Sequence, residues 1–138
     1  MVRVLVVDDE ATLLKNIARS LRRAGFEVIT AGDGAGARQA LEGSDVDVLC
    51  LDIHLPDGDG LDLLEEVRQT FPGIPAIVMS GAANPEHEPR ASRLGVEAFL
   101  SKPIRLSELK VLVARCSETI EGVGPKGVRK TKKRWTRR

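Results

Sequence analysis

Five short apolar runs, separated by amphipathic stretches, constrain the fold of this chain more than any other feature. Residues 4–7 and 46–51 are filled almost continuously by aliphatic side chains, which is typical of strands buried on both faces of a sheet. Further apolar runs cover residues 27–31, 75–79 and 96–100. Because strands of this kind occur in parallel sheets joined by crossover helices, the pattern predicts alternating strands and helices.

Helical periodicity fills the intervals between the runs. Apolar residues recur every three or four positions in the stretches that end at Gly25, at Gly43 and before Pro72, and again from Leu106 to about Ile120. Such spacing gives each helix one apolar face. We therefore predict an α/β fold, with a five-stranded parallel sheet in a doubly wound (βα)5 sandwich and helices on both faces.

The net charge of +1 conceals an acidic body and a basic C-terminal segment. Residues 126–138 contain eight Lys and Arg residues and no acid, which leaves 13 basic and 20 acidic residues in 1–125, a net of −7. The sequence accordingly predicts one domain over 1–121 and a basic, flexible tail over 122–138. The tail is too short to fold alone, and its charge suits nucleic acid, an anionic membrane or an acidic protein as a partner.

The cysteines and the hydropathy of the chain indicate a cytoplasmic protein without a metal-binding cysteine motif or a membrane span. Cys50 and Cys116 belong to no metal-binding motif, and Cys50 lies within an apolar run, so we interpret both as free thiols. No apolar run approaches the roughly 18 residues of a membrane span. Asp8 and Asp9 interrupt the position where a signal peptide would need its apolar stretch, which predicts a cytoplasmic protein.

Chemically active side chains follow four of the predicted strands. Asp8 and Asp9 come after the first strand, Asp52 after the third, Ser80 after the fourth and Lys102 after the fifth. Because the carboxyl ends of parallel strands meet at one edge of the sheet, we expect these side chains to converge there. Crowded carboxylates repel one another unless a cation neutralises them. An all-oxygen ligand set suits Mg²⁺, with Mn²⁺ as an alternative.

These residues resemble the receiver domain of two-component response regulators. The resemblance rests on the DD pair after the first strand, on Asp52 with the sequence IHLPDG behind it, on Ser80, and on Lys102-Pro103 after the fifth strand. It covers about residues 2–121. It implies a flavodoxin-like fold and a single-domain protein similar to the chemotaxis regulators.

The resemblance also implies roles for the acidic residues. Asp52 would accept a phosphoryl group from a sensor histidine kinase or a histidine phosphotransfer protein, in a reaction that the protein itself catalyses. Mg²⁺ would bind Asp8, Asp9, Asp52 and the backbone carbonyl of His54. The chain would then be a signalling switch rather than an enzyme that acts on an outside substrate.

Three further residues are implied in the switch. Lys102, followed by a cis bond to Pro103, would pair with one phosphoryl oxygen. Ser80 would donate a hydrogen bond to another oxygen and leave space for the ring of Phe99 to turn inward. The downstream protein would bind the face formed by the fourth helix, the fifth strand and the fifth helix.

Two features are particular to this chain. Pro89 lacks a donor for a helical hydrogen bond, so we expect the fourth helix, near Pro85 and Pro89, either to start at about Pro89 or to be short and mobile. His54, two positions after Asp52, and Ala82 lie where they can control how water reaches an acyl phosphate. We therefore expect substitution of His54 to alter the lifetime of the phosphorylated state.

Simpler interpretations exist for single residues. Asp8 and Asp9 taken alone could cap the first helix, and His54 could be an exposed loop residue. Residues 57–60 resemble part of a calcium loop, but the glutamate of an EF-hand is missing, so a turn followed by a helix cap is the better interpretation.

Two other functions remain open from the sequence. The first is a nucleic-acid-binding adaptor that acts through the basic residues 126–138. The second is a phosphohydrolase with Asp52 as its nucleophile. Such an enzyme would need a second acid or base close after the nucleophile, whereas this sequence has DIHLP there.

Overall fold

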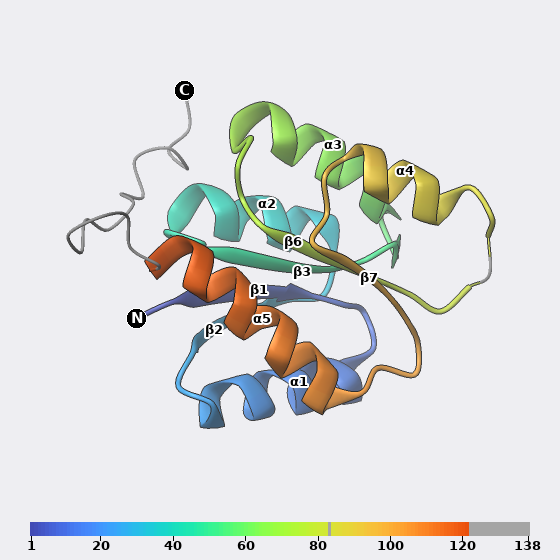
Figure 1. Ribbon diagram of the computed structural model, residues 1–138. Coiled ribbons are helices and arrows are strands. Elements are labelled where there is room, and N and C mark those ends of the chain that lie inside the picture. Colours follow the sequence, from blue (N-terminus) through green and yellow to red (C-terminus); the bar gives the residue numbers. More distant parts are fainter. Residues whose placement is uncertain (83, 122–138) are drawn as a thin grey trace.

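The computed structural model describes residues 1–82 and 84–121, and its central feature is a parallel five-stranded sheet in the order β2-β1-β3-β6-β7 (Figure 1). This strand order places β1 and β3 side by side at the point where the chain changes its direction of travel across the sheet. Open α/β sheets bind their ligands at such a point. The strands are β1 (Arg3–Val7), β2 (Glu27–Ala31), β3 (Val48–Asp52), β6 (Ala76–Ser80) and β7 (Ala98–Ser101).

Helices cover both faces of this sheet (Figure 1). On one face α1 (Ala11–Arg23) and α5 (Leu106–Glu121) lie side by side and contact each other. On the other face lie α2 (Gly34–Gly43), α3 (Gly60–Thr70) and α4 (His87–Arg93). The predicted α/β fold, a doubly wound sandwich around a parallel sheet, is confirmed.

The core is aliphatic and immobilises the strands that carry the site. Every residue of β3 and β6 is buried, and large side chains such as Leu49, Leu51, Ile77 and Met79 are completely inaccessible. Burying one such side chain stabilises a fold by about 1.5–3 kcal/mol. The carboxyl end of β3, where Asp52 lies, is therefore held from both faces of the sheet.

The predicted elements are present, with differences at their ends and in one loop. β3 starts at Val48, later than predicted. The Asp47 carboxylate just before it accepts the backbone N–H of Arg3 at 2.8 Å. The segment after Asp52 contains a short antiparallel ladder between β4 (His54–Leu55) and β5 (Gly58–Asp59), in addition to the five predicted strands.

The fourth helix, α4, is short, which is one of the two alternatives that its prolines suggested. It begins at His87, two residues before the start at about Pro89 that the other alternative gave, and its mobility stays a prediction. Pro89 is the third residue of the helix, where a backbone N–H would have no intrahelical acceptor. The first intrahelical hydrogen bond runs from the Arg90 N–H to the Glu86 carbonyl oxygen, at 3.2 Å. The missing donor of Pro89 is therefore tolerated.

Other expectations concern the cysteines, membrane spans and the tail. Cys50 and Cys116 are buried free thiols, as predicted. Burial raises the pKa of Cys116 to about 11 and also raises that of Cys50, which keeps both in the thiol form. None of the helices within 1–82 and 84–121 has both the length and the apolar composition of a membrane span. The predicted tail, 122–138, lies outside the described residues.

The loop between β3 and α3 ends in the helix cap expected near residues 57–60. The Asp59 carboxylate accepts the N–H of Leu61 at 2.6 Å and that of Asp62 at 3.4 Å. We expect Asp59→Ala to lower the free energy of unfolding by about 1 kcal/mol, because the first turn of α3 loses this acceptor. Urea unfolding of Asp59→Ala beside Asp45→Ala, which changes an exposed acid outside the helices, measures the difference. Equal stability of the two variants would contradict the cap.

Candidate functional site

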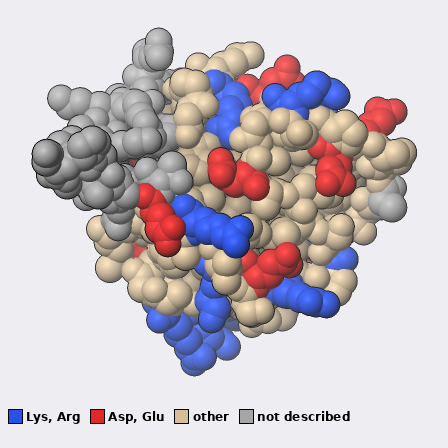
Figure 2. All heavy atoms as spheres, in the orientation of Figure 1, with Lys and Arg blue, Asp and Glu red and all other residues tan. Residues whose placement is uncertain are grey.

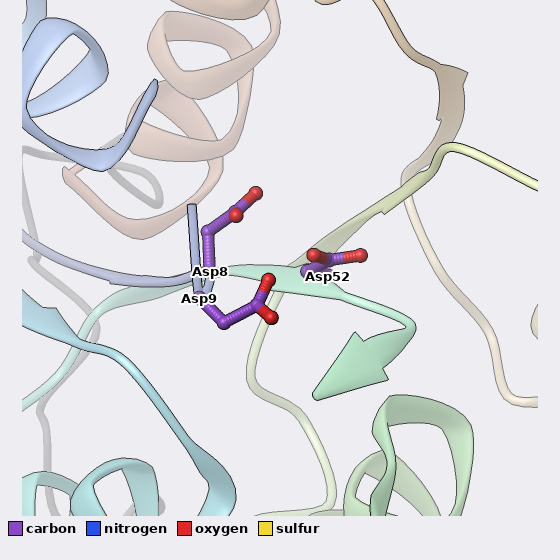
Figure 3. Close-up of side chains that lie close together, drawn as sticks. All are labelled: Asp8, Asp9 and Asp52. Atoms are coloured by element: carbon purple, nitrogen blue, oxygen red, sulfur yellow. The ribbon is translucent and has the colours of Figure 1, made fainter. Parts of the chain in front are cut away.

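The acidic side chains meet at the carboxyl ends of the two adjacent strands β1 and β3. Asp8 and Asp9 follow β1, and Asp52 is the last residue of β3. Their carboxylates gather in the space beyond the strand ends (Figure 3), and one oxygen of each lies within 4.8 Å of the others. Asp8 and Asp52 are buried, whereas Asp9 is exposed. The predicted convergence of these three residues is confirmed.

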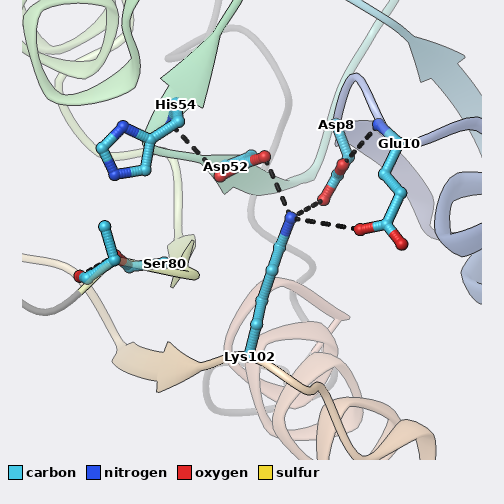
Figure 4. A network of polar contacts seen from close by, with 7 residues as sticks. Asp8, Glu10, Asp52, His54, Ser80 and Lys102 are labelled. Atoms are coloured by element: carbon cyan, nitrogen blue, oxygen red, sulfur yellow. Dashed lines mark hydrogen bonds and ion pairs between the residues drawn. The ribbon is translucent and has the colours of Figure 1, made fainter.

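Lys102 reaches the same cluster from beyond the end of β7 (Figure 4). Its Nζ lies 2.9 Å from Asp8 Oδ2, 3.1 Å from Asp52 Oδ2 and 3.9 Å from Glu10 Oε1. The peptide bond to Pro103 is cis, as predicted. Glu10 was not a predicted site residue, although its place directly after the DD pair pointed to it. A single ammonium group faces several carboxylates, so the site keeps an excess of negative charge.

The Asp52 carboxylate is oriented through both of its oxygens. Oδ1 accepts the backbone N–H of His54 at 3.1 Å, and Oδ2 accepts the Lys102 ammonium at 3.1 Å. Gly60 closes the loop behind it, since its N–H donates to the carbonyl oxygen of Ile53 at 2.5 Å. The carboxylate is therefore held in one direction, as a nucleophile needs to be.

Burial is the main influence on the protonation of Asp52. It raises the pKa of Asp52 above the ordinary value of 3.8, against the opposing effects of the His54 N–H and Lys102. Burial lowers the pKa of Lys102, but its contacts with Asp8 and Asp52 outweigh this effect and leave that pKa above 10.5. The ammonium therefore stays charged at neutral pH, and the buried carboxylate gains from any positive charge brought near it.

The oxygen atoms of the cluster fit a hard divalent cation. Asp8 Oδ2 is buried and, among the described residues, has an ion pair with Lys102 but no further hydrogen bond. Carboxylate oxygens of this kind are the ligands that Mg²⁺ and Mn²⁺ prefer. Asp8, Asp9 and Asp52 are thus the residues able to hold such an ion. The His54 backbone faces Asp52 through its N–H, and the ligand role of its carbonyl stays a prediction.

Ser80 and Phe99, the expected switch residues, lie on the side of the site toward α4. Ser80 is buried at the end of β6, and its hydroxyl donates to the Ala82 carbonyl oxygen at 3.0 Å (Figure 4). Phe99 is half-buried in β7 and lines a groove together with Pro85 and Ser92. In this structure the Ser80 hydroxyl is thus hydrogen-bonded to the backbone, and the switch roles stay predictions.

Two neighbours of the site make contacts that the sequence does not show. Asp57, in the turn between β4 and β5, accepts the backbone N–H groups of Gly34 at 2.7 Å and Ala35 at 3.0 Å, which ties the loop after β3 to the start of α2. His87, at the start of α4, contacts the ring of His54. Each contact joins segments that are distant in the chain, so no local sequence motif predicts it.

Known proteins with similar sequences point to one family. The pattern of the response regulator receiver domain matches residues 4–114. Two relatives from Mycobacterium tuberculosis are the "Probable transcriptional regulatory protein TcrX", 35% identical over 122 residues, and the "Transcriptional regulatory protein PrrA", 37% identical over 134 residues. The alignments cover 86% and 89% of this chain but 52% and 57% of the relatives. The chain thus spans little more than half of their length.

Solved structures agree with this assignment. A CheY-like response regulator receiver domain protein from Methanospirillum hungatei superposes with a TM-score of 0.80 at 28% identity, covering 86% of this chain and 95% of the other. The receiver domain of NtrX from Brucella abortus superposes with a TM-score of 0.78 at 35% identity, covering 84% and 98%. The similarity therefore extends over nearly the whole of each of these domains.

Proposed function

Because the chain belongs to the family of response regulator receiver domains, we propose that Asp52 accepts a phosphoryl group from a sensor histidine kinase or a histidine phosphotransfer protein. The observation that carries the proposal is the position of the Asp52 carboxylate. It lies at the end of a buried central strand, with Lys102 3.1 Å from Oδ2 and the carboxylates of Asp8 and Asp9 beside it. This arrangement combines a held nucleophile with an ammonium group that neutralises phosphoryl charge and with carboxylates able to hold a divalent cation.

The transfer is a displacement at phosphorus. An Asp52 oxygen forms a bond to phosphorus while the bond from phosphorus to the donor nitrogen breaks, and that nitrogen keeps the electron pair. The charge of the transition state lies mainly on the phosphoryl oxygens, so positioning and neutralisation supply most of the catalysis. Lys102 neutralises one of these oxygens. Mg²⁺ held by Asp8, Asp9 and Asp52 would neutralise phosphoryl charge as well.

Phosphorylation is proposed to act through Ser80 and Phe99. The Ser80 hydroxyl now donates to the Ala82 carbonyl, and a phosphoryl oxygen offers it a stronger, charged acceptor. A change of partner would alter the space beside Phe99 and the groove that this ring lines. The proposed output face is accordingly formed by α4, β7 and α5, where a downstream protein binds.

The signalling role is favoured over that of a phosphohydrolase. A hydrolase needs an acid or base directed at the phosphoryl group shortly after the nucleophile. Here the second residue after Asp52 is His54, whose side chain is exposed and packs against His87. We propose that the chain catalyses only its own phosphorylation and dephosphorylation.

Incubation with Mg²⁺ and a small phosphoryl donor, followed by intact-mass measurement, tests the proposed function. The wild-type chain is expected to gain one phosphoryl group and Asp52→Asn none, because the amide cannot act as the nucleophile. Asp45→Asn, an exposed acid outside the cluster, is expected to be labelled like the wild type. Labelling of Asp52→Asn to the wild-type extent would place the acceptor elsewhere.

A separate role is proposed for residues 122–138, a basic segment that follows the receiver domain. Acidic and basic side chains of the described residues are interspersed over the face seen in Figure 2, so that face offers no broad basic surface. We propose that a nucleic acid or an acidic protein binds through 126–138, whose eight Lys and Arg residues are balanced by no acid. Gel shifts across a salt series should show salt-sensitive binding that is lost when 122–138 is deleted. Binding that survives the deletion would refute this role.

A further inference from the structure

The two histidines of the sequence, His54 and His87, lie against each other beside the proposed phosphorylation site. Their ring centroids are 5.6 Å apart, and the ring planes are inclined by 57°. His54 belongs to β4 and donates its backbone N–H to Asp52 Oδ1, whereas His87 is the first residue of α4. The ring contact thus joins the loop after the proposed phosphoacceptor to a helix of the proposed output face.

The helix that carries His87 is held in place by contacts that lie outside the site. Arg90 of α4 contacts Asp62 and Glu65 of α3 at 2.7 and 2.9 Å. The backbone N–H of His87 donates to the Asn84 carbonyl oxygen at 3.1 Å. These contacts are made without β4, so the position of the His87 backbone does not depend on His54.

A second anchor holds the other end of α4. Arg68 of α3 donates from Nε to the Leu94 carbonyl oxygen at 2.8 Å and from Nη2 to the Gly95 carbonyl oxygen at 3.2 Å. Several donors of one guanidinium group at once fix both distance and angle. These hydrogen bonds hold α4 in place, and α4 carries the half-buried His87.

The side chain of His54, by contrast, is exposed. Exposed side chains exchange among rotamers within nanoseconds unless a neighbour restricts them. The ring contact with His87 supplies that restriction. The His87 Nδ1 atom is buried and has no hydrogen-bond partner among the described residues, so the two imidazoles are not joined by a hydrogen bond through this atom.

We propose that His87 is a positioning residue for the hydrolysis of phosphorylated Asp52, because it holds the His54 ring at the rim of the pocket, where the ring restricts the approach of water. In that hydrolysis a water oxygen bonds to phosphorus and the bond from phosphorus to the Asp52 oxygen breaks. The carboxylate is regenerated, inorganic phosphate leaves, and one proton passes to solvent. The inference rests on the proposed function and adds the residue on α4 that sets how long the phosphoryl group persists.

Decay of the phosphorylated protein tests this inference by a double-mutant cycle. The full chain is labelled with Mg²⁺ and a small phosphoryl donor, the donor is removed, and the loss of the phosphoryl group is followed by intact mass. His54→Ala and His87→Ala are each expected to speed decay about two- to tenfold, the range that corresponds to loss of one ring contact. The double variant is expected to decay no faster than His54→Ala. Multiplied effects in the double variant would overturn the inference.

Two matched variants and one independent measurement complete the test. His87→Phe keeps a ring of similar shape and is expected to retain the wild-type lifetime, as is Arg93→Gln at the exposed end of α4. A His87→Phe variant that decays like His87→Ala would overturn the packing role. In the unphosphorylated protein, nuclear Overhauser effects between the two imidazoles should be present, and their absence would refute the contact. If the wild-type chain is not labelled by the phosphoryl donor while the contact between the imidazoles is observed, the result refutes the proposed function.

Discussion

A Gly60→Ala variant is expected to lose about 3 kcal/mol of the free energy of unfolding, because position 60 has no room for a side chain. A Cβ atom there would lie 2.2 Å from the Asp52 carbonyl oxygen and 2.8 Å from the Ile53 Cα atom. Both obstacles are backbone atoms of a buried strand end, so they cannot move aside as a flexible side chain would. Overpacking of this kind typically costs about 1–3 kcal/mol, and rigid surroundings put it at the upper end.

The same substitution is expected to slow phosphorylation about 100-fold. Relief of the clash requires the backbone at Asp52 to shift, and a displacement of about 1 Å at a reacting group costs that much in rate. Urea unfolding and the initial rate of labelling by a small phosphoryl donor measure the two effects separately.

Gly43→Ala is the matched control for this prediction. Gly43 is the last residue of α2, and a Cβ atom there would meet no other atom within 4 Å. This variant is expected to be as stable as the wild type or up to about 1 kcal/mol more stable, because alanine favours the helix. If Gly60→Ala were as stable as Gly43→Ala, the prediction would be wrong, because the loop after β3 would then accommodate a Cβ atom with no loss in the free energy of unfolding.

A Lys102→Met variant is expected to be phosphorylated about 100-fold more slowly than the wild type. Methionine keeps an unbranched apolar stem but removes the ammonium group that lies 3.1 Å from Asp52 Oδ2 and 2.9 Å from Asp8 Oδ2. Removing one charge-stabilising donor from a transition state typically costs about 10²–10³ in rate. The rate of labelling at saturating Mg²⁺ measures this effect.

Lys102→Met should bind Mg²⁺ more tightly than the wild type, although it is phosphorylated more slowly. Without the ammonium group the buried carboxylates lose their competing cation, so titration calorimetry is expected to show tighter Mg²⁺ binding than in the wild type. Lys110→Met, which changes an exposed lysine of α5, should match the wild type in both measurements. An unchanged rate of labelling in Lys102→Met would exclude Lys102 from the transfer step.

The acidic cluster was predictable because a parallel sheet brings the carboxyl ends of its strands to one edge. Asp8, Asp9, Asp52 and Lys102 each follow a recognisable apolar run, so their convergence needs only the strand order of a doubly wound sheet. Pro89 was harder to interpret, since its effect depends on where α4 begins. The helix starts two residues earlier, which places the proline in a first turn that needs no donor from it.

Other contacts were not predictable, for a common reason. The bonds from Gly34 and Ala35 to Asp57 join α2 to the loop after β3, and the contact between His54 and His87 joins that loop to α4. Side-chain packing and rotamers decide such pairs, and these depend on atoms from several elements at once.

Apolar periodicity and short motifs are local properties of a chain. The order of strands and helices, the family and the residues at the edge of the sheet could therefore be predicted from the amino-acid sequence. The way in which those residues contact one another depends on the folded structure. It shows Lys102 between Asp8 and Asp52, a glycine pressed against the Asp52 backbone, and a histidine pair that connects the site to α4. These arrangements arise from close packing, in which each side chain takes the position that its distant neighbours leave open.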